Sequence, residues 1–129
     1  MGTDHSGTAD NLQMLADVYR KQGKYTQAES LYLRVLSLYE GQVGADHPRM
    51  ATSLNSLGFL YQTQKRYAEA EPLYRRALAI REQQLGLAHP DTGVSLNNLV
   101  TCYQEQGKDA EAEMLLVRTL ARRSLQGES

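Results

Sequence analysis

The stretch that decides the fold is LNSLGFLYQTQKRYAEAEPLYRRALAIREQQLGLAHP, residues 54–90. Partial copies of it stand 42 residues earlier and 42 residues later, and ten alignment columns hold the same residue in all three copies. The column that begins each copy, for example, contains Leu12, Leu54 and Leu96. Self-similarity at a fixed spacing indicates an array of one repeated supersecondary unit. The chain is therefore predicted to be a repeat protein.

Each copy contains two runs of apolar residues at helical spacing, separated by a short break. Gly86 suits the end of one helix, and Pro90 suits the start of the next. Pro72 falls inside a predicted helix, where we expect a slight bend because the apolar pattern continues in phase on either side. The pattern predicts helices at about 8–22, 25–43, 49–64, 67–85, 91–106 and 109–125.

These helices form one predicted domain over residues 8–126. Its repeats are expected at about 8–48, 49–90 and 91–126. Residues 1–7 are small and polar and are predicted to be a disordered tail, and residues 127–129 form a second short tail.

The amino-acid composition argues against several classes of function. The net charge of −1, from 14 basic and 15 acidic residues, predicts no long-range attraction to nucleic acid or to an anionic membrane. No apolar run approaches the roughly 20 residues needed to cross a bilayer, and the N-terminus lacks the blocks of a signal peptide. The single cysteine, Cys102, forms no internal disulfide, which fits a reducing compartment. A cytoplasmic location is expected.

No residue pattern predicts an enzyme, a metal site or a cofactor. The sequence shows no nucleophile paired with a base, no phosphate-binding loop and no paired catalytic carboxylates. His47 and His89 stand 42 residues apart, and each precedes a proline, so we expect them to cap the following helices. Cys102 falls in an apolar register and is predicted to be a buried, unreactive thiol.

The spacing of small and large residues in the middle copy resembles the tetratricopeptide repeat, with leucine for the usual tryptophan and tyrosine for the usual phenylalanine. The matching residues are Leu54, Leu57, Gly58, Tyr61, Ala70 and Tyr74. The 42-residue unit and the phrases LNxL and LGxxHP are similar to the kinesin light chain class of these repeats. The resemblance implies an all-α, right-handed α-solenoid of three helix-turn-helix repeats, with about six antiparallel helices. Small Gly58 would let two helices approach closely, whereas Val100 crowds the same column in the third copy.

The same resemblance implies a concave groove lined by the first helix of each repeat, in a protein–protein interaction module that binds a peptide or partner segment. Asn55 and Asn97 match an asparagine that holds a peptide backbone in the kinesin light chain class. Phe59 is either an aromatic anchor or a packing residue between neighbouring first helices. The alternative for the amides is ordinary solvated surface. The predicted partner-binding residues are Gln13, Asp17, Arg20, Asn55, Phe59, Gln62, Asn97, Thr101 and Gln104.

The last predicted helix supports a different function. Leu116, Val117 and Leu120 do not form the polar outer face that a terminal repeat needs for solubility. Either the sequence is an internal piece of a longer protein, or this end packs against something. We therefore expect self-association through the terminal helices, giving a homo-oligomer. The alternative function is an architectural unit that stacks through its ends and has no dedicated peptide ligand.

Overall fold

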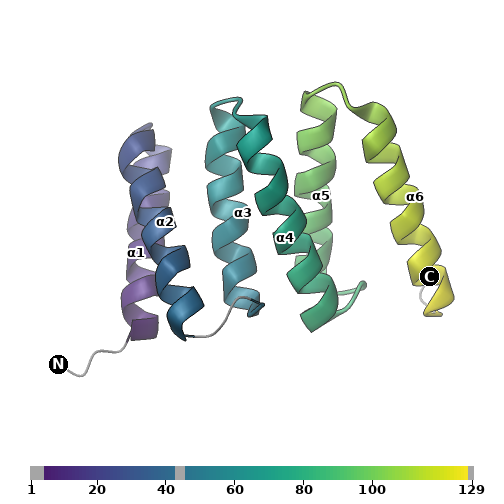
Figure 1. The fold of residues 1–129 in the computed structure, drawn as a ribbon, viewed down its shortest axis with the longest axis horizontal. Helices are drawn as coiled ribbons and strands as arrows, with labels where there is room; N and C mark the ends of the chain where they lie inside the picture. The colour runs from purple at the N-terminus through teal and green to yellow at the C-terminus, as the bar shows by residue number, and fades with distance from the viewer. Residues whose placement is uncertain (1–4, 43–45, 128–129) are drawn as a thin grey trace.

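The computed structural model of the chain describes residues 5–42 and 46–127, and over these residues it contains α-helices and no strand. Figure 1 shows the helices side by side in chain order, each running opposite to its neighbour. This is the all-α arrangement of three helix pairs that the repeat predicts. The six helices are α1 (His5–Lys21), α2 (Tyr25–Gln42), α3 (Pro48–Thr63), α4 (Tyr67–Leu85), α5 (Pro90–Glu105) and α6 (Asp109–Leu125).

The helix boundaries lie close to the predicted ones. α1 begins at His5, three residues before the expected start at Thr8. α4 continues without interruption through Pro72, so the proline does not break it. The predicted turn at Gly44 lies outside the described residues, as do residues 1–4 and 128–129 of the predicted tails.

The two repeated histidines cap the helices that follow them, as predicted. The His47 Nδ1 accepts a hydrogen bond from the backbone N–H of Arg49 at 3.1 Å. The His89 Nδ1 accepts one from the backbone N–H of Asp91 at 3.0 Å. Each bond satisfies a backbone donor that has no partner in the first turn of a helix, so both histidines have a structural role.

Residue size in one column determines how closely the two helices of a pair approach. A Cβ atom placed on Gly58 would stand only 2.8 Å from Cε1 of Tyr74, so only glycine allows the present contact between α3 and α4. The same column holds Ala16 in α1 and Val100 in α5. α6 lies less closely against α5 than α4 lies against α3 (Figure 1), and a cavity of about 280 Å³ is lined by α4, α5 and α6. The looser third pair agrees with the larger residue at this position, Val100.

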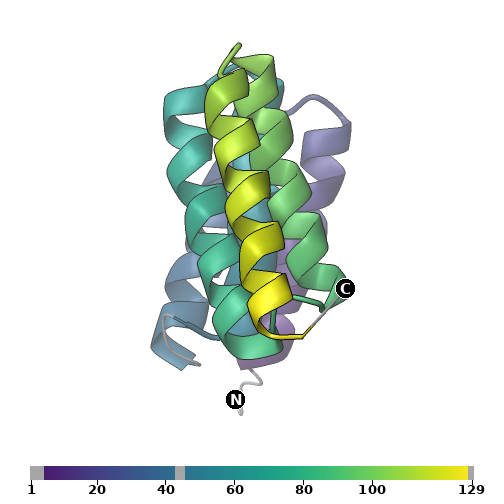
Figure 2. The same ribbon diagram turned by 90° about the vertical axis from the view of Figure 1, so that its right-hand side faces the viewer.

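The first helices of the pairs form an inner layer. Cα atoms of α1 and α3, and of α3 and α5, approach within 8 Å of each other. Among the described residues, no such approach exists between α2 and α4 or between α4 and α6. Figure 2 shows the array from its C-terminal end, with α6 in front of α4 and α5. Because the inner helices lie closer together, the array curves toward α1, α3 and α5.

Candidate binding groove

The inner face of α1 is tied to α3 by Gln13. Its side-chain Nε2 donates to the Ser56 hydroxyl at 2.8 Å, and its Oε1 accepts from the Ser53 hydroxyl at 3.0 Å. Both ends of the Gln13 amide are therefore used within the protein. Gln13 lies at the predicted place, but its contacts hold two inner helices together and leave little capacity for a ligand.

The next turn of α1 carries a polar network with α2. The Tyr32 hydroxyl donates to a carboxylate oxygen of Asp17 and accepts from Nε of Arg20, the latter at 3.2 Å. Burial, followed by the hydrogen bond to Asp17, raises the pKa of Tyr32 to about 12. The network fixes the position of the half-buried Arg20, whose guanidinium carbon lies 5.0 Å from the centroid of the Phe59 ring.

Phe59 lies at the centre of the inner layer, on α3. Its side chain is 48% exposed and is absent from the buried core. The structure therefore favours a surface position, held by the cation–π contact with Arg20, over packing between first helices. Sequence reasoning found Phe59 but not its contact with Arg20, because the two residues belong to different copies of the repeat.

Two other residues predicted on α3 are more buried than expected. Gln62 is buried, and its Oε1 accepts from the Tyr74 hydroxyl at 2.6 Å, so its side chain belongs to the α3–α4 contact and not to the open face. Asn55 is half-buried, and its Nδ2 donates to the Ser95 hydroxyl of α5 at 3.0 Å. The Asn55 Oδ1 has no hydrogen-bond partner among the described residues and is shielded from solvent.

The inner face of α5 is open. Asn97, Thr101 and Gln104 are all exposed, as predicted. No side chain in the described part of the chain forms a hydrogen bond with theirs, so their donors and acceptors face solvent. The predicted residues thus form two groups. Those on α1 and α3 mostly form hydrogen bonds within the protein, those on α5 are exposed to solvent, and Phe59 lies between the two groups.

A pocket of about 260 Å³ opens between α1, α2 and α3. Met14 and Thr52 line it, together with the hydrogen-bonded pair of Asp10 and Tyr39 and the basic side chain of Arg49. Sequence reasoning missed this pocket, because its lining combines Tyr39 of α2 with residues of α1 and α3. Its residues belong to three helices and share no motif.

Some chemistry has no support in this geometry. No helix in the described segments is both long enough and apolar enough to cross a membrane. The described residues also contain no group of three histidine, cysteine or acidic side chains placed to hold a metal ion.

Comparison with known proteins identifies the repeat. A family profile of the tetratricopeptide repeat matches residues 6–83 and again residues 49–124. The chain belongs to the tetratricopeptide repeat family. Domains of this family are generally protein–protein interaction modules and are typically not catalysts. No curated protein sequence matched the chain.

Solved structures confirm the fold. BtubC (BKLC) from P. vanneervenii is 28% identical with a TM-score of 0.80, over 94% of this chain and 48% of that one. A kinesin light chain-type protein from Podosopora anserina with nearly identical TPR-like repeats is 27% identical with a TM-score of 0.80, over 90% and 55% of the two chains. The present chain thus spans about half the length of these relatives. The TPR domain of Arabidopsis FLU shares the fold. It is 18% identical with a TM-score of 0.73, over 94% of this chain and 98% of that one.

Proposed function

We propose that the chain binds a peptide segment of a partner protein on its inner face, with Phe59 as the central apolar contact. The observation that carries the proposal is the 48% exposure of this aromatic ring in the middle of the inner layer. Arg20 holds the ring from one side, so ordering it on binding costs little conformational entropy. Aromatic residues at the centre of an interface commonly dominate the binding energy.

The residues around Phe59 suit a peptide backbone. Asn97 and Gln104 each offer an amide donor and an amide acceptor, the same pair of groups that a peptide bond presents. Thr101 lies between them on the exposed face of α5. Asn55 is a weaker candidate, because its Nδ2 already bonds to Ser95 and its Oδ1 is shielded.

The pocket between α1, α2 and α3 adds a place for a side chain. The thioether of Met14 is flexible and adapts to apolar groups of different shape. Asp10 and Arg49 supply opposite charges at the same pocket. We therefore expect the ligand to be a peptide of mixed charge, with one apolar residue on Phe59 and a second side chain near Met14.

The test uses a display library of random linear peptides as the probe, followed by measurement of the dissociation constant of the selected peptides. Phe59→Ala is expected to raise this constant about 30-fold, the effect of losing a central anchor. The matched control is Leu33→Ala, because Leu33 has the same 48% exposure but lies on the outer helix α2. The control is expected to bind as the original chain does.

Two asparagine variants separate recognition from packing. Asn97→Ala is expected to weaken peptide binding without lowering the free energy of unfolding, because its side chain faces solvent. Asn55→Ala is expected to lower stability as well, because it removes the bond to Ser95. Failure to select any peptide, or equal binding by Phe59→Ala and Leu33→Ala, would show that the inner face is not a peptide site.

A further inference from the structure

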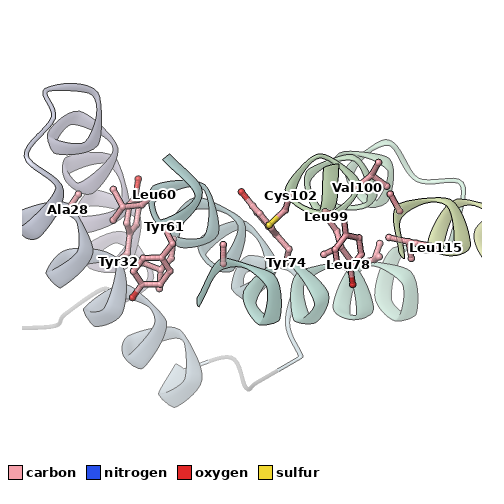
Figure 3. Close-up of a cluster of buried hydrophobic side chains, with 14 of the residues drawn as sticks. Ala28, Tyr32, Leu60, Tyr61, Tyr74, Leu78, Leu99, Val100, Cys102 and Leu115 are labelled. Carbon is pink, nitrogen blue, oxygen red and sulfur yellow. The ribbon is translucent and has the colours of Figure 1, made fainter. Parts of the chain in front are cut away.

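Consecutive repeats meet through the same contact twice. Figure 3 shows Tyr32 of α2 beside Leu60 and Tyr61 of α3. It shows Tyr74 of α4 beside Cys102 of α5. Tyr32 and Tyr74 occupy the same column of the repeat, as do Leu60 and Cys102, and all four are fully buried. The second helix of one repeat is therefore built to receive the first helix of the next.

Each of these interfaces also contains a glutamate, and the two glutamates stand in one column of the repeat. Glu29 of α2 accepts from the Tyr61 hydroxyl at 2.9 Å and forms an ion pair with Arg66 at 3.0 Å. Glu71 of α4 forms an ion pair with Lys108 at 3.1 Å. In both cases the cation comes from the turn after the first helix of the next repeat.

The third copy presents the receiving half of this contact, and no described residue of the chain occupies it. Leu116 and Leu120 of α6 stand in the columns of Tyr74 and Leu78, yet they are 39% and 63% exposed. Glu113 stands in the column of the two interface glutamates, is exposed, and has no cation within ion-pair distance in the described part of the chain. A hollow of about 560 Å³ lies over this face.

The first copy presents the inserting half. Leu15 and Val18 of α1 are 40% and 47% exposed, whereas the residues in their columns on α3, Leu57 and Leu60, are buried. The ammonium of Lys24 stands 5.6 Å from the centroid of a ring in its own repeat, that of Tyr19.

An equivalent cation–aromatic pair, formed by Arg66 and Tyr61, binds Glu29 inside the array. There the Arg66 guanidinium lies 4.4 Å from the Tyr61 ring centroid, and both residues contact the carboxylate. Lys24 and Tyr19 occupy the columns of Arg66 and Tyr61. The first repeat therefore carries a site for a glutamate that no described residue of its own chain fills.

We propose that a second copy of this chain docks head to tail, with α1 of one copy on the exposed face of α6 of the other. Val18 would then meet Leu116, as Leu60 meets Tyr32 inside the array. Glu113 would accept from Tyr19 and pair with Lys24. Both halves of the interface are present in one chain, and their charges and apolar columns are complementary, which selects a second copy as the occupant.

The proposal refines the role of the three residues predicted for self-association. Leu116 and Leu120 lie at the centre of the docking face. Val117 shares its column with Leu33 and Arg75, which are exposed even where repeats meet, so Val117 belongs to the rim. A head-to-tail contact leaves one free end on each side, so it produces growing chains of copies unless a ring closes.

The first test exchanges charges across the proposed contact. Lys24→Glu and Glu113→Lys each place like charges in every homotypic contact, and each is expected to raise the dissociation constant about tenfold, which is about 1.4 kcal/mol. When the two variants are mixed, the carboxylate introduced at position 24 meets the ammonium introduced at position 113, and the reverse contact keeps its original charges. Association is therefore expected to return in the mixture, as followed by sedimentation velocity. Lys65→Glu, in the middle repeat, and Glu111→Lys are the matched controls, because both residues are exposed and neither is placed in the proposed contact.

The second test fixes the direction of docking. Leu15→Asp blocks the α1 end and Leu120→Asp blocks the α6 end, and helical circular dichroism of each variant checks its fold. Each variant alone is expected to be a monomer, and an equimolar mixture is expected to stop at a dimer of one copy each. A monomeric original chain at every concentration would overturn the proposal. So would a Leu15→Asp variant that dimerises alone, because that result requires α6 to dock on α6.

Discussion

The contact between Gly58 and Tyr74 allows a quantitative test of how the repeat packs. Replacing Gly58 with alanine adds one methyl group that would stand 2.8 Å from Cε1, 3.0 Å from Cδ1 and 3.1 Å from Cζ of the Tyr74 ring. The ring is fully buried, and its hydroxyl is held by Gln62, so it cannot move aside freely. The substitution therefore forces α3 and α4 apart.

Two effects of opposite sign determine the result. Alanine is favoured over glycine in a helix interior by about 1 kcal/mol. Adding a methyl group to a well-packed core costs about 1–3 kcal/mol. We expect Gly58→Ala to lower the free energy of unfolding by about 1 kcal/mol, the difference between about 2 kcal/mol of overpacking and the gain in helix propensity.

Gly93 provides the matched control. It also lies in a first helix, but a Cβ atom there would meet nothing within 4 Å. Gly93→Ala is therefore expected to raise the free energy of unfolding by about 0.5–1 kcal/mol from helix propensity alone. The assay is urea unfolding followed by circular dichroism, with the two substitutions compared in the same buffer.

A second substitution tests the cause. The third copy pairs the larger Val100 with Leu116 in place of a tyrosine, so Tyr74→Leu is expected to relieve part of the cost of Gly58→Ala in a double-mutant cycle. If Gly58→Ala stabilised the chain as much as Gly93→Ala did, the close contact would not control the helix spacing, and the reasoning would fail.

The hydrogen bonds support two further predictions. The pKa values of Tyr32, Tyr39 and Tyr61 are raised from 10.0 to about 12, by burial and then by bonds to carboxylates. Since the folded pKa exceeds the unfolded one, this stabilisation is complete below pH 10 and is lost as pH rises toward 12; urea unfolding between pH 8 and pH 12 measures it, and a flat profile contradicts it. His89→Ala is expected to cost about 1 kcal/mol through the lost helix cap, whereas His89→Asn, which restores a capping acceptor, should recover most of it in the same assay.

The packing of the helices could be predicted from the sequence because the same helix contacts recur in each repeat. A column that must contact a neighbouring helix has one environment in all copies, so its residue type reveals that environment. This is why Gly58 was predicted to lie at a close approach and Val100 to be crowded, and both expectations agree with the helix spacing. The caps formed by His47 and His89 were predicted for the same reason.

The inner face was harder to predict. Helical periodicity gives the side of a helix on which a residue lies, but it does not show which side chains of the neighbouring helix contact that residue. Gln13 and Asn55 lie on the predicted side, yet α3 and α5 place serine hydroxyls where these amides bond to them. Gln62 is drawn into the core by the Tyr74 hydroxyl. These contacts depend on residues about 12 to 43 positions away in the chain, and no local pattern indicates them.

The columns that differ between copies are the ones with room to carry specificity. At several packing positions, such as those of Leu57 and Ala70, the same residue recurs in every copy, because a change of volume there opens a cavity or a clash. On the inner face one column holds Asp17, Phe59 and Thr101, which have no chemistry in common. No packing requirement is shared by all three members of this column, so each copy can present a different group to a ligand. The residues proposed for docking, Glu113 and Lys24, stand instead in columns whose other members join consecutive repeats. The two proposed surfaces meet at Gln104, which lines the hollow over α6 together with Leu116 and Leu120, whereas Phe59 does not line that hollow. Phe59→Ala is therefore expected to weaken peptide binding alone, and Glu113→Lys to weaken docking of a second copy alone.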